Sequence, residues 1–387
     1  MHDGWTYHYG RWIATSKAAV GLLLVASRDL VARGRSSGAW ILPTAPAARE
    51  TTYDPTMHMG LPGGYGMRAA TLDDIPAVVA VGRACDLEDF GEVDFHEDFL
   101  LDDWRRPRFD ATTDTWVVTE PGGEVVAFAS TWDEEPFTIF DSAGWVHPRH
   151  RGLGIGTALV LAVERRAARD PGEVPAGSAL RVHQSFDADA SGARAPDSSR
   201  ARALFERLGY LPEREFLHMQ IDVQDGFDPG DAPAGIEVRT RVEGDDPGIF
   251  TAMDEGFRQH WGYRPDPYEE WLQQWLVSAG FDPTLWFVAL EGDEIVGALQ
   301  GKVTDGRGWV DSLAVRDAWR RRGIGEALLR AAFATFRERG LSTVILNVDR
   351  DNTTGATRLY ERAGMRLRRR WLVVAKTLTA APQNSTK

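Results

Sequence analysis

Cysteine is almost absent from this chain of 387 residues, which contains Cys85 alone. A single thiol excludes a disulfide within the chain and argues against a thiolate zinc site. It is also typical of proteins that work in a reducing cytosol, so we expect a cytoplasmic protein without a bound metal. Cys85 follows the apolar residues Val78, Val79 and Val81 at helical spacing, which favours a core thiol over a catalytic one.

Positive charge is also in short supply. The chain has 44 Lys and Arg against 57 Asp and Glu, a formal charge of −13, which disfavours non-specific nucleic-acid binding. A long apolar run is missing too, because the run at residues 18–26 has only nine residues and is too short to span a bilayer. We therefore expect a small-molecule partner, no nucleic acid, no membrane, and a monomer or homodimer.

Residues 1–62 differ from the rest of the chain. Pro43, Pro46, Pro55 and Pro62, together with several glycines, give this segment a linker composition. We expect a poorly ordered extension outside the folded domains, with Met67 as a sensible domain start. Hydrophobic content of 43% and charged content of 26% are those of a globular protein, and the length suits two or three domains.

Residues 310–329 combine a strand, a glycine turn and a helix. Apolar residues at the start predict a strand, the run 320–325 contains three arginines and two glycines, and an apolar stripe at helical spacing follows. Glycines admit close approach to a ligand, and the unpaired N–H groups of a helix start attract an anion. The stretch therefore predicts a phosphate site. It lacks the third glycine of the dinucleotide fingerprint and the Gly-Lys-Ser/Thr of the P-loop.

The arrangement of Arg320, Gly323 and Gly325 resembles the pyrophosphate loop of the GCN5-related N-acetyltransferases (GNAT), which use acetyl-coenzyme A. An ordinary glycine turn into a helix would explain this stretch by itself. A second signature of the family follows at the expected distance, after a predicted buried strand. It comprises Asn352, Ala356, Leu359, Tyr360, Glu361, Gly364 and Met365.

The same pattern occurs twice. Arg151, Gly154 and Gly156 repeat the first signature, and the two loops lie 169 residues apart (323 − 154). This distance indicates two copies of one domain rather than a solenoid. We expect an extension at 1–62, a first domain at 63–224, a linker at 225–234, a second domain at 235–378 and a tail at 379–387.

The resemblance implies an α/β (α+β) fold with two tandem GNAT domains, each a mixed, mostly antiparallel sheet flanked by helices. In this family two central strands splay apart and the pantetheine arm of the cofactor lies between them. The sequence pattern predicts a helix at 247–258, and strands at 67–70, 115–119, 125–130, 180–185, 236–239, 286–290, 295–301, 342–348 and 366–375.

The resemblance also implies that acetyl-coenzyme A is the co-substrate. An N–H within residues 313–315 would donate to the oxyanion. The expected cofactor-binding residues are Leu313, Ala314, Val315, Arg320, Arg321, Arg322, Gly323, Ile324, Gly325, Glu326 and Asn352 in the second repeat, and Val146, Arg151, Gly152, Gly154, Ile155, Gly156 and Thr157 in the first.

Acetyl transfer to an amine requires a base, an oxyanion donor and an acid for the leaving thiolate. The resemblance assigns the acid to Tyr360, for which a core aromatic is the alternative. Asp311 is the candidate base, with substrate binding or a solvated strand position as the alternatives. Glu255 and His260 are weaker candidates.

The first repeat lacks the corresponding groups. It has Phe205 at the position of Tyr360, Ser142 at that of Asp311, and Asp197 at that of Asn352. We expect it to be catalytically degenerate, so that it either holds acetyl-coenzyme A without turnover or only supports the second repeat.

A tandem pair with an active second half resembles the mycothiol synthases, which acetylate a cysteinyl amine. Those enzymes carry a glutamate six residues before the valine matching Val315, where this chain has Trp309, although Asp311 lies one step along the same strand face. The expected activity is N-acetyl transfer to a small primary amine. Mycothiol synthesis proper and a non-catalytic acyl-coenzyme A binding or scaffold protein remain as alternatives.

Overall fold

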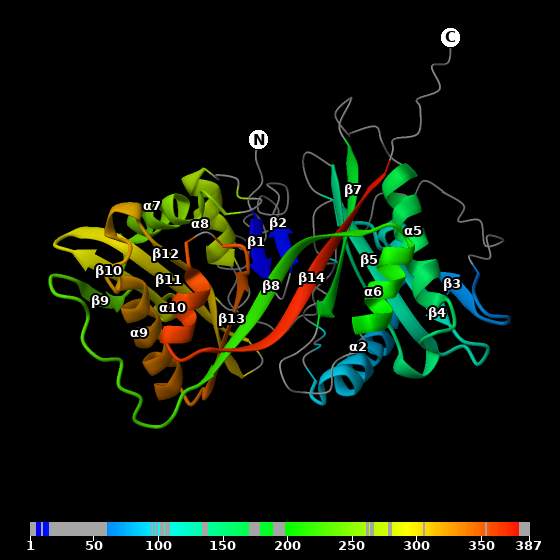
Figure 1. Cartoon of the computed structure of the whole chain (residues 1–387), viewed down its shortest axis with the longest axis horizontal. Helices are drawn as coiled ribbons and strands as arrows, with labels where there is room; N and C mark the ends of the chain where they lie inside the picture. The colour runs from blue at the N-terminus through cyan, green and yellow to red at the C-terminus, as the bar shows by residue number, and fades with distance from the viewer. Residues whose placement is uncertain are drawn as a thin grey trace, which may run out of the picture. The chain divides into compact units, whose positions relative to one another are not determined.

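The computed structural model describes residues 5–8, 11–14, 60–93, 95, 97, 100, 104, 109–133, 138–169, 179–188, 198–260, 263, 267–277, 281–304, 306–352 and 354–378 (Figure 1). The chain divides into two compact units, and each is described by itself. Most of the N-terminal extension, residues 189–197 and the C-terminal tail lie outside the described residues. In the extension the structure describes an antiparallel hairpin, β1 (Trp5–His8) and β2 (Arg11–Ala14), which the sequence pattern did not predict.

The smaller unit comprises Ser16–Val182 together with residues from Leu378 onward, and it carries the first glycine loop. Its strands follow one another in antiparallel order: β3 (Gly66–Arg68), β4 (Thr115–Thr119), β5 (Val125–Asp133) and β6 (Ile139–Val146). Its helices are α2 (Ile75–Phe90), the short α4 (Ala111–Asp114) and α5 (Ile155–Arg169), with 3-10 turns η1 (Leu72–Asp74) and η2 (Pro148–His150). The predicted core thiol is confirmed, since Cys85 is 4% exposed and donates to the carbonyl of Val146.

The larger unit comprises Met1–Thr15 and His183–Thr377, and it carries the second glycine loop. Its strand order is β7-β14-β8-β13-β12-β11-β10-β9. The strands are β7 (Leu180–Ala188), β8 (Leu211–Asp222), β9 (Glu237–Thr240), β10 (Trp286–Glu291), β11 (Glu294–Thr304), β12 (Arg307–Val315), β13 (Thr343–Asp349) and β14 (Arg366–Leu378). Its helical segments are α6 (Ser198–Arg207), α7 (Asp246–Phe257), α8 (Tyr268–Val277), α9 (Ile324–Glu338), α10 (Ala356–Arg362), η3 (Pro283–Leu285) and η4 (Asp317–Trp319).

Alternation along β10 shows how this sheet is covered on both faces. Trp286 and Val288 pack with residues of α7 and α8, whereas Phe287 and Ala289 pack with residues of α9. Figure 1 shows α7 and α9 on opposite sides of β11 and β12. Because side chains alternate along a strand, a central strand covered on both faces must be apolar throughout. This architecture agrees with the predicted mixed, mostly antiparallel sheet flanked by helices.

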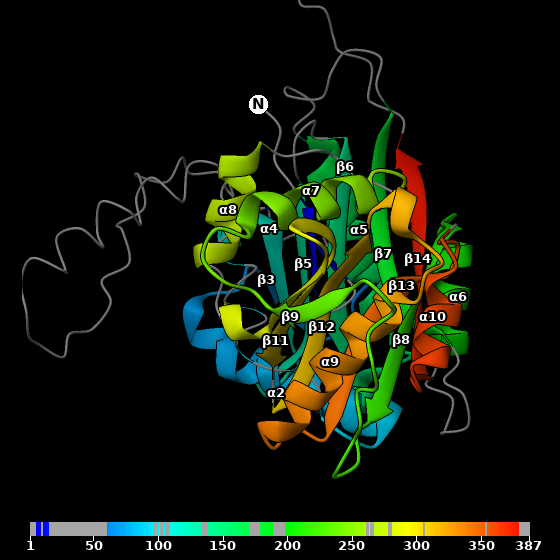
Figure 2. The same ribbon diagram turned by 90° about the vertical axis from the view of Figure 1, so that its left-hand side faces the viewer.

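The two repeats exchange their last strands, so that each repeat's last strand lies beside strands of the other repeat. β8 ends the first repeat, yet it pairs antiparallel with β13 of the second, from Asp222↔Thr343 to Phe216↔Asp349. β14 ends the second repeat, pairs with the other edge of β8, and lies next to β7. Figures 1 and 2 show β8 and β14 side by side along their length. The compact units therefore do not divide at the interdomain linker expected at 225–234.

Most predicted elements occur in the structure with small changes at their ends. β5, β7, β11 and β14 extend beyond their predicted ends, and β3 begins at Gly66 rather than Met67. The aromatic-rich stretch after α7 contains helix α8, which was not assigned from the sequence. Its Trp271 and Trp275 pack against Trp286 with ring centroids 6.2 and 5.2 Å apart.

Candidate active site

A fork between β12 and β13 forms the centre of the candidate site. These two strands are parallel neighbours, and they pair at Gly308↔Val344 and Trp309↔Ile345. Over the described stretch 306–352 no later pair joins them, although β12 stays paired with β11 as far as Val315 and β13 with β8 as far as Asp349. The inner edges of the fork thus carry backbone polar groups that need partners, as an amide-bearing ligand would supply.

The glycine loop follows directly on one arm of the fork. Gly323 has φ +83° and precedes Ile324, the first residue of the 15-residue helix α9. The first repeat has the same backbone, with Gly152 at φ +81° and Gly154 at φ +86°. Positive φ is readily adopted by glycine, and the first N–H groups of the helix that follows have no partner within it, which suits an anion.

Arg320 and Arg151, the first residues of the two loop signatures, both turn inward. The Nε of Arg320 donates to the carbonyl of Val315 at 3.1 Å, and the Nε of Arg151 donates to the carbonyl of Val146 at 3.2 Å. Arg320 also donates to the carbonyl of Gly256 at the end of α7, at 3.2 Å. Arg151 forms a bidentate ion pair with Asp89 of α2, at 2.6 and 2.7 Å. Each signature arginine therefore fastens its loop to the preceding strand and to the first long helix of its repeat.

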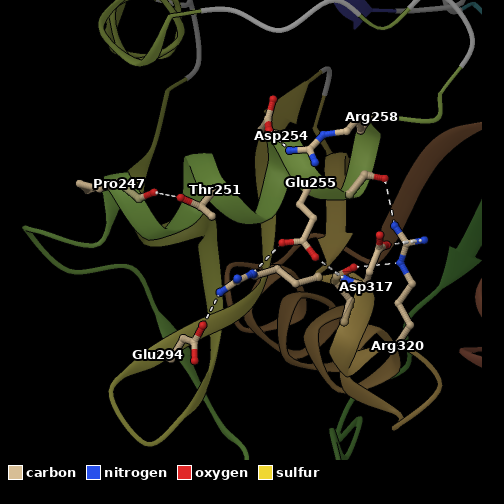
Figure 3. Close-up of polar contacts among 11 residues, drawn as sticks. Pro247, Thr251, Asp254, Glu255, Arg258, Glu294, Asp317 and Arg320 are labelled. Atoms are coloured by element: carbon tan, nitrogen blue, oxygen red, sulfur yellow. Dashed lines mark hydrogen bonds and ion pairs between the residues drawn. The ribbon is translucent and has the colours of Figure 1, made fainter.

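Glu255 belongs to the same fastening rather than to proton transfer (Figure 3). Its Oε1 accepts from the N–H of Asp317 at 2.7 Å and its Oε2 accepts from Arg316 Nε at 2.9 Å. Although burial alone would raise it, these hydrogen bonds hold the pKa of Glu255 below its ordinary value. A carboxylate of lowered pKa is a weak base, so Glu255 fits a structural role at the loop.

The other two loop arginines differ in their contacts. Arg322 pairs with Glu291 at 2.5 Å. Arg321 is exposed and has no ion pair or hydrogen bond among the described residues. Its φ of +64° makes it the one non-glycine residue with positive φ in the part of the chain that the structure describes. A left-handed arginine is strained, and such strain gathers at functional positions.

Two other predicted cofactor contacts are used within the protein. The Oδ1 of Asn352 accepts from the N–H of Thr354 at 2.8 Å and from the hydroxyl of the same residue, in a turn just before α10. Glu326 pairs with Arg330 at 3.3 Å and with Arg362 at 3.7 Å. Asn352 thus shapes the entry to α10, and Glu326 links α9 to α10.

Tyr360 lies on α10 and is 8% exposed within the core cluster that includes Leu346 and Val348 of β13. Burial raises the pKa of its phenol to about 12. The hydroxyl therefore keeps its proton throughout the neutral range.

Asp311 lies on the β12 arm of the fork, at a register irregularity between Gln300 and Gly301 of the neighbouring strand. Its Oδ1 forms an ion pair with Lys302 Nζ at 2.6 Å, and the two side chains are 2% and 7% exposed. Its Oδ2 accepts from Ser312 Oγ at 3.3 Å. Burial lowers the pKa of Lys302, and the charge of Asp311 opposes that shift. The sequence pattern did not indicate this partner, since a lysine on a neighbouring strand is not part of any signature.

The first repeat has no phenol at the position of Tyr360 and no carboxylate at the position of Asp311. Phe205 packs between Phe186 and Tyr210, with ring centroids 5.5 Å away in each case. Ser142 is 5% exposed on β6. Asp197 lies outside the described residues.

A metal centre has no support in the described part of the chain, where no three His, Cys, Asp or Glu side chains are grouped to hold an ion. The helices described likewise include none long and apolar enough to cross a membrane. His260, the other weak base candidate, follows the end of α7 and has its ring 5.6 Å from that of Phe257.

Comparison with known proteins supports the two-repeat interpretation. The model of the acetyltransferase (GNAT) family matches residues 83–210 and again 248–365. The mycothiol acetyltransferase of Streptomyces scabiei is 30% identical over 247 residues, covering 63% of this chain and 73% of that protein. Its counterpart in Streptomyces coelicolor is 29% identical over 252 residues, covering 64% and 75%.

Solved structures agree with the fold. A GCN5-related N-acetyltransferase from Sphaerobacter thermophilus has 33% sequence identity and a TM-score of 0.71, and the match covers 82% of this chain and 96% of that one. A tandem GNAT protein from the clavulanic acid biosynthesis pathway has 16% identity and a TM-score of 0.61, covering 83% and 100%. At that identity the second match shows the fold alone.

Proposed function

Because the chain belongs to the acetyltransferase (GNAT) family, we propose that its second repeat transfers an acetyl group from acetyl-coenzyme A to the primary amine of a small molecule. The observation that carries the proposal is the open fork between β12 and β13, which leads directly into the glycine loop. The fork offers unpaired backbone groups to the amides of a pantetheine arm, and the loop offers N–H groups to a pyrophosphate.

The residues of the fork and loop fit this donor chemically. The Nδ2 of Asn347 on β13 is buried without a hydrogen-bond partner in the described structure, and a carbonyl of the donor would satisfy it. Arg321 supplies an exposed cation that no acidic side chain of the described residues occupies. Arg320 would act indirectly by holding the loop, and Tyr360 would donate the proton that the departing thiolate requires.

Mycothiol acetylation is the second candidate for the reaction. Similarity to the mycothiol acetyltransferases of two Streptomyces species favours it. Trp309 argues for a different acceptor, because it is 2% exposed in the position where the resemblance predicts a glutamate. A non-catalytic acyl-coenzyme A binding protein is a third reading, which Phe205 favours for the first repeat and Tyr360 disfavours for the second.

Thiol release from acetyl-coenzyme A in the presence of a panel of amines tests the proposal. The panel includes the mycothiol precursor, polyamines, aminoglycosides and peptide N-termini. We expect amine-dependent thiol release with at least one small primary amine, and mass spectrometry should find the acetyl group on its nitrogen. Binding of acetyl-coenzyme A without release across the panel would favour the non-catalytic alternative.

A further inference from the structure

The second glycine loop and the helix that follows it in the second signature carry cations that the first repeat lacks. In both loops the residue directly after the signature arginine has positive φ, +81° in the first repeat and +64° in the second. The positions that differ in charge hold Arg321, Arg322 and Arg358 in the second repeat, and Gly152, Leu153 and Ala203 in the first. Since the first loop adopts the same backbone without them, the fold of the loop does not require these charges.

Two of the three consecutive arginines in the second loop have acceptors within the protein. Arg322 lies 2.5 Å from Glu291 in the hairpin between β10 and β11, and the same carboxylate accepts from Trp319 Nε1 at 2.7 Å. Arg320 donates to two backbone carbonyls and lies 2.9 Å from Asp317. Both guanidinium groups therefore have tasks in holding the loop together.

Arg321 differs from its two neighbours because its charge is uncompensated. Its side chain is exposed, and within the described ranges no carboxylate pairs with it. Glu326, in the first turn of α9, is engaged with Arg330 at 3.3 Å and with Arg362 at 3.7 Å. An arginine stays charged at any physiological pH and presents a fork of N–H donors, which suits the oxygens of a phosphate.

The covalent order of acetyl-coenzyme A defines which of its phosphates lies beyond the loop. The pantetheine arm precedes the pyrophosphate, and a ribose with a 3′-phosphate monoester follows it. With the arm in the fork and the pyrophosphate on the loop, the ribose phosphate lies on the side of the loop away from the fork. A phosphate monoester carries a charge of about −1.5 to −2 at pH 7, so it calls for a cation there.

Helix α10 adds positive charge beside the start of α9. The side chain of Leu359 lies 3.0 Å from the position that a Cβ on Gly325 would occupy, so the two helices are in contact. Arg358 is exposed and lies one helical turn before Arg362. Residues four apart share a face of a helix, and the contact of Arg362 with Glu326 turns that face toward the first turn of α9.

We propose that Arg321 binds the ribose 3′-phosphate of the acetyl donor and makes the second repeat selective for coenzyme A thioesters over those that lack this phosphate. The inference rests on the proposed acetyl transfer. Arg321 donates to the monoester from the loop, and α10 contributes further positive charge. The first loop has no such donor, because Gly152 stands at the matching position.

A comparison of two donors tests this assignment in the full chain. The donors are acetyl-coenzyme A and acetyl-3′-dephospho-coenzyme A, each with the best amine of the panel. The measured quantity is the ratio of their kcat/KM values, which reports only on a repeat that turns over. We expect the parent to favour acetyl-coenzyme A by about five- to fiftyfold, as a solvent-exposed bond between charged groups allows. Arg321→Gly should lower kcat/KM for acetyl-coenzyme A by about that factor and leave the other donor within about twofold.

Two further variants serve as matched controls. Arg321→Lys keeps a positive charge and should keep most of the preference. Arg322→Leu removes the neighbouring, paired cation and gives that position the side chain of Leu153, so the ratio should stay within about twofold of the parent. High salt should reduce the parental preference, because exposed charges are screened.

The outcomes separate the role of Arg321 from the function on which it rests. An equal loss with both donors in Arg321→Gly, which leaves their ratio at the parental value, overturns the assignment. A parent that uses both donors equally well overturns it too, but leaves the acetyl transfer in place. A parent that turns over neither donor with any amine overturns the acetyl transfer and the role of Arg321 with it. If Arg321→Gly does not fold, Arg321→Asn decides, because asparagine tolerates positive φ.

Discussion

Single side chains distinguish two repeats that share a backbone. The glycine loops have matching left-handed residues, and both signature arginines donate to the carbonyl at the end of the preceding strand. The difference is in single polar groups: a phenol in Tyr360 against the plain ring of Phe205, and a carboxylate in Asp311 against the hydroxyl of Ser142. Loop geometry alone is therefore no measure of activity.

Tyr360→Phe should lower kcat by about a hundred- to ten-thousand-fold and leave the affinity for acetyl-coenzyme A nearly unchanged. The ring and its packing remain, and only the hydroxyl that we propose as the donor to the thiolate is removed. Steady-state kinetics and calorimetry on the same preparation measure both quantities. The reverse change in the first repeat, Phe205→Tyr, should add no activity to a chain that carries Tyr360→Phe. Parental turnover by Tyr360→Phe across the pH range would make the tyrosine structural.

Substitutions of Arg320 and of Arg321 should distinguish support of the glycine loop from binding of the ligand. Arg321→Gly removes the strain of an arginine at positive φ, but it also raises the conformational entropy of the unfolded chain. The free energy of unfolding should therefore change by less than about 1 kcal/mol. Binding of acetyl-coenzyme A should still weaken, because an exposed cation is lost.

Arg320→Ala should weaken the binding of acetyl-coenzyme A and also lower the free energy of unfolding by about 1–3 kcal/mol, because the carbonyls of Val315 and Gly256 lose their hydrogen-bond donor. Thermal melts with and without acetyl-coenzyme A measure both effects. Equal destabilisation by the two changes would contradict this division.

At the scale of elements, each repeat opens with the same strand-to-helix clamp. Arg68 binds Asp74 through two bonds of 2.6 and 2.7 Å, and Arg239 binds Asp245 at 2.7 and 3.0 Å. Both pairs are offset by 171 positions (239 − 68 and 245 − 74). Each aspartate also accepts an N–H three residues earlier, so one carboxylate joins a strand end to a helix start.

Asp74→Asn should therefore destabilise the smaller unit in a pH-dependent way. Hydrogen bonds from Arg68, against the effect of burial, lower the pKa of Asp74 to about 2, below the ordinary value of about 3.9. A lowered folded-state pKa stabilises above pH about 4, and that contribution is lost as the pH falls toward 2. We expect Asp74→Asn to lower the free energy of unfolding by about 1–2 kcal/mol at pH 7, a figure that allows for the exposure of Arg68 to solvent. This difference should vanish near pH 2. Denaturant titrations at both pH values measure it.

The segment before β3 belongs to the first repeat. The hydroxyl of Tyr65 lies 2.9 Å from His150 Nδ1, next to the glycine loop, and Gly66 pairs with Thr119. A chain starting at Gly60 should keep the parental melting temperature. A chain starting at Met67 should lose about 1–3 kcal/mol, because it lacks these contacts. Equal melting temperatures for the two truncations would show that the contacts add little.

At the scale of the whole molecule, the exchanged strand makes the second repeat depend on the first. β8 lies between β13 and β14, so a fragment of residues 225–387 would expose strand edges on both. We expect that fragment to aggregate or to lack a cooperative melt. A fragment of residues 198–387, which retains α6 and β8, should be soluble and fold cooperatively. Circular dichroism and size-exclusion chromatography distinguish the outcomes, and cooperative folding of the shorter fragment would refute the dependence.

Local features of this protein are determined by its sequence. The glycine loops, the apolar stripe of α9 and the strands around the hairpins follow from residue periodicity and turn chemistry, which act over a few positions. The two signatures also identified the family, because they lie on these local elements. Helix α8 was not predicted from the sequence, because its many aromatic residues could pack in a helix or in a strand.

Only the tertiary structure decided which strand neighbours β13 and which side chains face the fork. The linker composition at 225–234 placed a boundary between repeats, but strand pairing is set by the total apolar surface that each arrangement buries, which no local pattern encodes. The ion pair of Lys302 with Asp311 and the contact of His218 with Asn347 depend on that pairing. The sequence thus determined that the glycine loops and the phenol of Tyr360 exist, and the fold determined which side chains of other strands lie beside the fork.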